Sequence, residues 1–71
     1  MGFEFMHVVD YKGGHHYFDP SKITDVYTQN KDDDTEFYVV LEKFRIIVMK
    51  GKLKEMEDFV KKVEKNVNKN V

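Results

Sequence analysis

The chain has 71 residues, of which 41% are hydrophobic and 35% are charged, and only five are glycine or proline. This composition is typical of one small globular domain spanning residues 1–71 and excludes a disordered tail. The 12 basic and 13 acidic side chains nearly cancel, so the positive charge of a dedicated duplex-DNA-binding protein is missing. We therefore expect no duplex nucleic acid among its partners. The lack of cysteine excludes disulfide bonds and thiolate chemistry.

No part of the sequence has the character of a membrane segment. No apolar stretch approaches the roughly 20 residues that a membrane-spanning helix needs. The first ten residues include Glu4, His7 and Asp10, which is not the pattern of a secretory signal peptide. We expect no membrane span and a cytoplasmic location.

The first part of the chain predicts a hairpin of two strands. Residues 3–11 alternate with a period of two and include β-branched and aromatic side chains, which indicates a strand. Lys12-Gly13-Gly14 is typical of a turn, because glycine adopts positive φ at no steric cost. Residues 15–18 resume the extended character. Asp19-Pro20-Ser21-Lys22 then ends the strand, since proline has no amide donor, and predicts a bend or one short helical turn.

Three more strands are predicted in the middle of the chain. Residues 23–28 contain isoleucine, valine, tyrosine and two threonines, a composition that favours a strand. The polar run of residues 29–34 is the clearest loop. Residues 36–41 and 44–49 are two apolar runs separated by Glu42-Lys43, so together they predict a second hairpin.

The hydrophobic period changes after Lys52 to that of an amphipathic helix. We expect this helix over residues 52–67, with a frayed tail over residues 68–71. The predicted fold is α+β, in the order β-β-β-β-β-α: a mostly antiparallel sheet of about five strands over residues 1–49, with the helix packed on one face. The hydrophobic helix positions recur at intervals of three and four: Leu53, Met56, Val60, Val63 and Val67.

The second predicted hairpin is hydrophobic on both of its faces. Its first strand alternates Phe37, Val39 and Leu41 with Tyr38 and Val40. One helix covers one face, and an exposed apolar face of several hundred Å² usually marks an interaction surface. We expect a protein partner or a homo-oligomer, unless the sheet closes on itself as a small, partly open barrel. Aromatic side chains dominate interface energetics, and the candidate contact residues are Tyr17, Phe18, Tyr27, Tyr38 and Val40.

The sequence gives only weak signals for a metal ion or for catalysis. His15 and His16 are adjacent, but neighbours on a strand point to opposite faces. With Asp19 they are the only metal candidates, and we expect no metal and no cofactor. The acidic run of residues 32–34 lacks the glycine and the final glutamate of an EF-hand loop, which indicates a solvated loop. A turn or capping role explains the lone serine, Ser21, so we expect no enzyme activity.

The first half of the chain has a distinctive spacing of turn and aromatic residues. Gly13 is followed by the aromatic pair Tyr17-Phe18, and Pro20 lies seven residues after the glycine. Ile23 and Val26 lie three and six residues beyond the proline. This spacing resembles the small flagellar protein family FlbD, whose pattern runs from a glycine turn through a short aromatic strand to an Asn-Pro bend and a strand with spaced isoleucines.

The resemblance to FlbD covers about Val9 to Val63, since a valine-rich hairpin followed by a short helix closes the same layout. Asp19 stands where the family has asparagine, and Glu42-Lys43 replaces its Thr-Gly turn. The resemblance implies a non-enzymatic bacterial accessory protein that acts through contacts.

The sequence therefore predicts a protein-binding or accessory module, bacterial or from a phage, that acts through a sheet face and through self-association. One alternative is a viral or mobile-element inhibitor that sequesters a host protein or a small ligand. The other is a metal or nucleotide binder at the first hairpin, centred on His15, His16 and Asp19.

Overall fold

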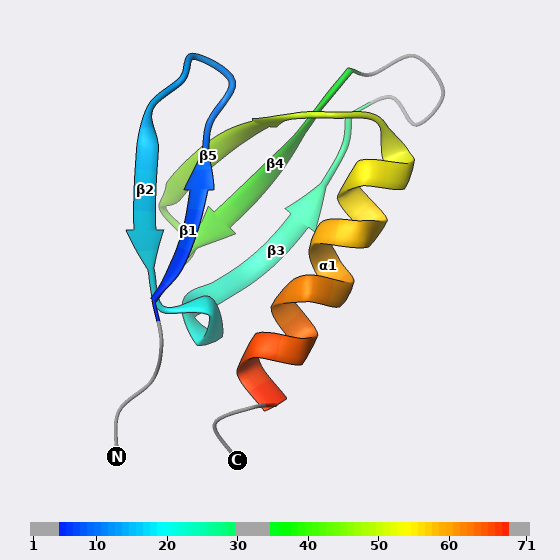
Figure 1. The fold of residues 1–71 in the computed structure, drawn as a ribbon. Helices are drawn as coiled ribbons and strands as arrows, with labels where there is room; N and C mark the ends of the chain where they lie inside the picture. The colour runs from blue at the N-terminus through cyan, green and yellow to red at the C-terminus, as the bar shows by residue number, and fades with distance from the viewer. Residues whose placement is uncertain (1–4, 30–34, 69–71) are drawn as a thin grey trace.

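A computed structural model describes residues 5–29 and 35–68 of the chain. Five strands and one C-terminal helix confirm the predicted α+β fold and its element order (Figure 1). A helix long and apolar enough to cross a membrane is not found in these two ranges. The predicted acidic loop at residues 32–34 lies outside them. The elements are β1 (Met6–Val9), β2 (His15–Phe18), a 3₁₀ turn η1 (Pro20–Lys22), β3 (Ile23–Tyr27), β4 (Glu36–Leu41), β5 (Arg45–Lys50) and α1 (Leu53–Asn68).

Strands β1 and β2 form an antiparallel hairpin in which His7 lies opposite Tyr17. Its turn contains Gly13 at φ 88°, a conformation that glycine adopts without a steric penalty. The carboxylate of Asp10 accepts hydrogen bonds from the amides of Lys12 (2.9 Å) and Gly14 (2.7 Å), which fixes the loop. The predicted first hairpin is therefore confirmed, with β1 beginning at Met6.

The Asp-Pro bend after β2 is the short helical turn that the sequence predicts. Pro20 occupies the first position of η1, where its missing amide donor costs nothing. The Asp19 carboxylate caps this turn by accepting from the amide of Ser21 at 2.9 Å and from its hydroxyl at 2.8 Å. Capping of this turn thus explains why Asp19 and Ser21 occupy these positions.

Strands β3, β4 and β5 form the second antiparallel sheet, with β4 in the centre. The register between β3 and β4 shifts between Ile23 and Asp25, which is where the strict alternation of the sequence fails. The connection between β4 and β5 is the tight turn predicted at Glu42-Lys43, and both residues have positive φ, 54° and 72°. Positive φ at both central positions is typical of the hairpin turns that match the twist of a sheet.

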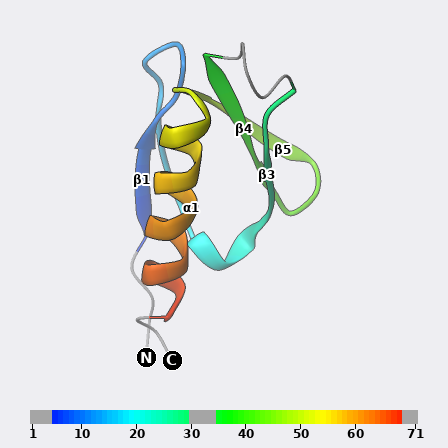
Figure 2. The same ribbon diagram turned by 90° about the vertical axis from the view of Figure 1, so that its right-hand side faces the viewer.

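The five strands divide between two sheets instead of forming the one sheet that we expected. A hydrogen bond from the Tyr11 amide to the Val48 carbonyl, 2.7 Å long, joins the end of the first hairpin to β5. Helix α1 lies across the side of the core between β1 and β3 (Figures 1 and 2). Because the two sheets and the helix surround one core, each layer buries one apolar face.

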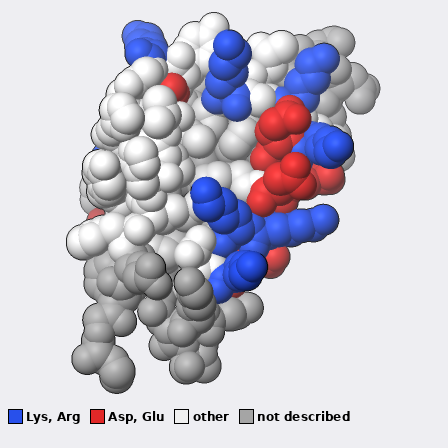
Figure 3. Space-filling model, viewed as in Figure 1, with Lys and Arg blue, Asp and Glu red and all other residues white. Residues whose placement is uncertain are grey.

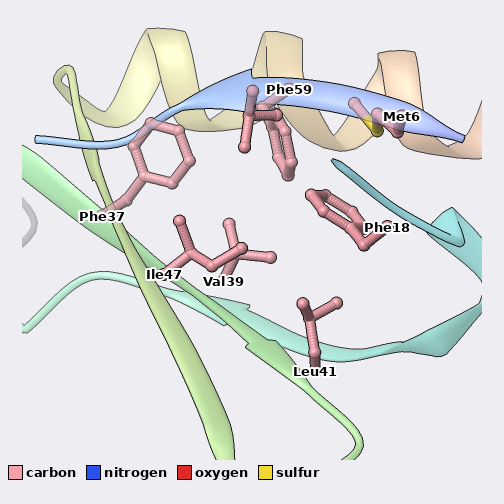
Figure 4. Packing of buried hydrophobic residues seen from close by; sticks show 8 residues of the cluster. Met6, Phe18, Phe37, Val39, Leu41, Ile47 and Phe59 are labelled. Atoms are coloured by element: carbon pink, nitrogen blue, oxygen red, sulfur yellow. The ribbon is translucent and has the colours of Figure 1, made fainter. Parts of the chain in front are cut away.

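The core lies between the two sheets and the helix (Figure 4). Phe37 and Phe59 bring β4 and α1 together, with ring centres 5.7 Å apart. Phe59 is the most buried described side chain of the helix, although it is not among the hydrophobic positions predicted to face the sheet. Of the predicted helix positions, Met56 and Val63 pack against the core beside Phe59. The buried hydrophobic residues are Met6, Val8, Phe18, Phe37, Val39, Leu41, Ile47 and Phe59.

Candidate functional site

The face of the second sheet that points away from the core is the main candidate surface. We call it the outer face and define it by alternation along the three strands: side chains next to the buried Phe37, Val39 and Ile47 point the opposite way. No described helix or strand packs on this face, whereas α1 and the first hairpin cover the other one. The outer face consists of Asp25 and Tyr27 from β3, Glu36, Tyr38 and Val40 from β4, and Ile46, Val48 and Lys50 from β5.

The centre of the outer face is aromatic and aliphatic. Tyr38 lies opposite Tyr27 on one side and Val48 on the other. The rings of Tyr27 and Tyr38 stack with their centres 5.2 Å apart and their planes at 19°. The Tyr38 hydroxyl donates to the Glu36 carboxylate at 3.1 Å. Ile46 is 54% exposed, which is unusual for isoleucine on a strand. The face is therefore a mostly apolar patch with its polar groups at the edges.

A pocket of about 380 Å³ opens where the outer face meets the first hairpin. Its apolar wall is formed by Tyr38, Ile46 and Val48, and the hairpin supplies Tyr11 and Lys12 on the other side. The hydrogen bond between Tyr11 and Val48 holds the two walls together. This pocket makes the outer face concave at one edge, so a projecting side chain from another protein can fit there.

A chain of hydrogen bonds connects the first hairpin to β5 at the end of this pocket. His16 Nε2 lies 2.6 Å from Asp10 Oδ2, and its Nδ1 lies 3.0 Å from Arg45 Nη2. The arginine nitrogen can only donate, so Nδ1 of His16 accepts this hydrogen bond, and Nε2 donates to the Asp10 carboxylate, which can only accept when it is ionised. The bond from His16, together with the Gly14 and Lys12 amides, holds the pKa of Asp10 below its ordinary value. These hydrogen bonds hold the first hairpin against β5.

The exposed side of the first hairpin carries a second group of rings. His7 Nε2 lies 2.8 Å from His15 Nδ1, and the His7 ring stacks on Tyr17 with centres 4.5 Å apart. Figure 3 shows few charged side chains on the side of β1 and β2, whereas charged side chains gather over α1. This second surface is polar but nearly uncharged, and it lies on a different sheet from the outer face.

Three of the five predicted contact residues come together on the outer face: Tyr27, Tyr38 and Val40. Tyr17 is 64% exposed but lies on the first hairpin. Phe18 is only 5% exposed and packs in the core, so its choice as a contact residue is wrong. The physical reason is that Phe18 lies opposite Met6 in the hairpin, and the face that carries both residues points toward the core.

The suggested metal candidates are not brought together. His16 is bound to Asp10 and Arg45, and Asp19 caps η1. His15 pairs instead with His7, which is not among the metal candidates predicted from the sequence. The register centres the hairpin on Lys12, not on the glycine pair, and this places residues 7 and 15 on the same face. Composition alone does not fix that register, so it does not predict the pair. Within residues 5–29 and 35–68, no three or more His, Asp or Glu side chains form a group that could hold a metal ion.

Comparison with known proteins gives no match to a protein-family model, to a curated protein or to a solved structure. The resemblance to FlbD therefore stays a prediction.

Proposed function

We propose that this protein is a non-enzymatic binding module whose outer face pairs with the outer face of a second copy. The observation that carries the proposal is the apolar set of side chains at the centre of this face, on which no described helix or strand packs and in which Ile46 is 54% exposed. A chain of this length buries only about 60% of the surface that its unfolded form exposes, a smaller share than a larger domain buries, so covering this face in a dimer stabilises the protein further.

The charges at the corners of the outer face favour a second copy as the occupant. Asp25 lies at the β3 edge in the row of Val40 and Ile46, and Lys50 lies at the β5 edge in the opposite row. Both side chains are exposed. A two-fold axis in the plane of the face and passing over Tyr38 exchanges these two corners. Each Asp25 then faces Lys50 of the other copy, and the contact occurs twice.

The same two-fold axis matches the apolar positions of the face. Tyr38 meets its own equivalent at the centre, and Val40 of each copy meets Val48 of the other. The strands of the two copies cross steeply, which is one of the two ways in which sheets pack face to face. An interface of this kind is self-complementary, as the closed symmetry of a dimer requires.

The pocket beside the outer face supports the same role. It gives the interface a concave edge lined by Tyr11, Tyr38 and Val48, where a side chain of the second copy can be enclosed. Side chains enclosed in pockets at the centre of an interface, aromatic ones above all, supply most of the binding energy of protein interfaces.

Charge reversal at the two corners tests the proposal. We expect Asp25→Lys and Lys50→Asp each to weaken self-association by about tenfold, because each replaces two attractive contacts with repulsive ones. The double variant, with both changes, restores the contacts in the reverse sense and recovers the wild-type dissociation constant. Light scattering during size-exclusion chromatography at several concentrations measures the average mass, and so the dissociation constant, of the wild type, the two single variants and the double variant.

The outcomes separate the possible occupants of the face. Weaker self-association in both single variants, with the wild-type dissociation constant recovered in the double variant, supports the two-fold dimer. Equal dissociation constants in all four proteins contradict the arrangement. A wild-type protein that stays monomeric contradicts self-association and leaves a different protein as the occupant of the outer face.

A further inference from the structure

His7 and His15 are neighbours on the exposed side of the first hairpin. His7 is paired with Tyr17, and His15 with Val9, so the two histidines lie diagonally across the strands on one face. The ring planes differ by 3°, and the ring centres are 5.0 Å apart. Because the facing nitrogens are only 2.8 Å apart, much closer than the centres, the rings meet edge to edge. One of the two facing nitrogens carries the proton of this hydrogen bond, and the other accepts it.

The hairpin holds this pair in position. Tyr17 stacks on the ring of His7 at 4.5 Å and 16°, which limits the rotation of the imidazole. Four residue pairs fix the register of β1 and β2 beneath the rings. Both histidines are exposed, so water can reach the open side of the pair. Positioned ligands lose less conformational freedom when they bind an ion.

We propose that His7 Nε2 and His15 Nδ1 form a two-ligand site for a divalent transition-metal ion of the Zn²⁺ type. The hydrogen bond places one shared proton between two nitrogens, and a cation can replace that proton. Zinc binds imidazole nitrogen at about 2.0–2.1 Å, so a tetrahedral site needs the nitrogens about 3.3 Å apart. The observed 2.8 Å separation has to widen by a fraction of an ångström.

Imidazole suits Zn²⁺, Ni²⁺ and Cu²⁺ better than it suits Mg²⁺ or Ca²⁺, which prefer oxygen ligands. Water completes the coordination, because the described residues offer two side chains at this point and no group of three or more. Both ligating nitrogens must be free of protons, so affinity for the ion falls as the pH falls.

His16 provides an internal control within the same protein. It follows His15 directly but points to the other side of the hairpin, where Asp10 and Arg45 occupy both of its nitrogens. A metal ion that binds non-specifically to histidine would affect all three rings, whereas the proposed site involves only two of them.

The test is a titration of the full-length chain with Zn²⁺ alone, followed by the imidazole nitrogen and carbon signals in NMR spectra. We expect the His7 and His15 signals to shift together and saturate at one ion per chain, while the His16 signals stay in place. His7→Gln and His15→Gln should each weaken Zn²⁺ binding by about tenfold or more, since even indirect partners of a ligand have effects of that size.

Three results would overturn the site: no shift on addition of Zn²⁺, shifts of all three histidines together, or unchanged affinity in both variants. The amide spectrum of each variant shows whether it has folded, and Tyr17→Phe keeps the stacking ring and should keep the affinity. The site lies on the first hairpin and not on the outer face. The result of this titration is therefore independent of whether the protein self-associates through the outer face.

Discussion

Tyr27 and Tyr38 face each other across β3 and β4 with their ring centres 5.2 Å apart, at the middle of a sheet face that no described element covers. Stacked aromatic pairs contribute about 0.5–1.5 kcal/mol beyond their buried area. Here the pair also creates a flat, rigid platform. The hydroxyl of Tyr38 is directed to Glu36 at the edge, which leaves the ring as the centre of the apolar surface.

Removing this ring should affect association more than folding. We expect Tyr38→Ala to weaken self-association by about 2 kcal/mol, the size of effect found for anchor residues at interfaces. Tyr17→Ala is the control, because Tyr17 is also a tyrosine on a strand but is 64% exposed and lies on the first hairpin, whereas Tyr38 is half-buried on the outer face. Dilution experiments in an isothermal titration calorimeter measure the dissociation constants of the two variants. Equal effects of the two substitutions would show that the outer face is not the contact surface.

Two consecutive isoleucines on β5 separate the core from the outer face. Ile47 is 1% exposed and Ile46 is 54% exposed. Ile47→Ala should lower the free energy of unfolding by about 2–5 kcal/mol, because it leaves a cavity. Ile46→Ala should lower it much less at dilute, monomeric concentrations, while weakening self-association. Urea unfolding measures stability, and equal losses in the two variants would contradict the assignment of the two faces.

The Asp10 carboxylate predicts a pH-dependent contribution to stability. Its hydrogen bonds with His16, Gly14 and Lys12 lower its pKa in the folded state below the ordinary value of 3.8. The contribution is therefore fully present above pH 3.8, where the unfolded chain is also ionised, and is lost as the pH falls through the lower folded-state pKa. Asp10→Asn removes this contribution, so the difference in unfolding free energy between the two proteins should shrink as the medium becomes more acidic. A difference that grows instead would mean that the pKa is raised.

The turn at Glu42-Lys43 carries a conformational cost that a better turn sequence removes. Both residues have positive φ, which is unfavourable for side chains other than glycine and asparagine. Replacing the pair by Asn-Gly should raise the free energy of unfolding by about 1 kcal/mol, corresponding to an increase in melting temperature of about 4–8 °C. Thermal unfolding followed by circular dichroism measures the change. An unchanged or lower melting temperature would contradict this prediction.

Local patterns predicted the elements well because the responsible interactions are local. The alternation of Phe37, Val39 and Leu41 with Tyr38 and Val40 gave both faces of β4, since side chains on a strand alternate. The Asp-Pro bend and the glycine turn were identified from residue chemistry alone. The spacing of three and four runs through Leu53, Met56, Val60, Val63 and Val67. It includes Met56 and Val63 but steps past Phe59, which lies between them on the same side of the helix and packs in the same core.

The tertiary relationships could not be predicted in the same way. The division into two sheets depends on how the first hairpin packs on β5, and no periodicity in the sequence contains that information. The same holds for the bond between His16 and Arg45, which are 29 residues apart. Phe18 was misplaced for this reason too, since only the packing of the hairpin decides which of its two faces points inward.

Sedimentation equilibrium of the full chain, from micromolar to millimolar concentration, tests the central claim most directly. Self-association through the outer face predicts an average mass that rises from 8.5 kDa toward twice that value as the concentration increases. Tyr38→Ala should move this rise to higher concentration. A mass that stays at 8.5 kDa over the whole range would contradict the account.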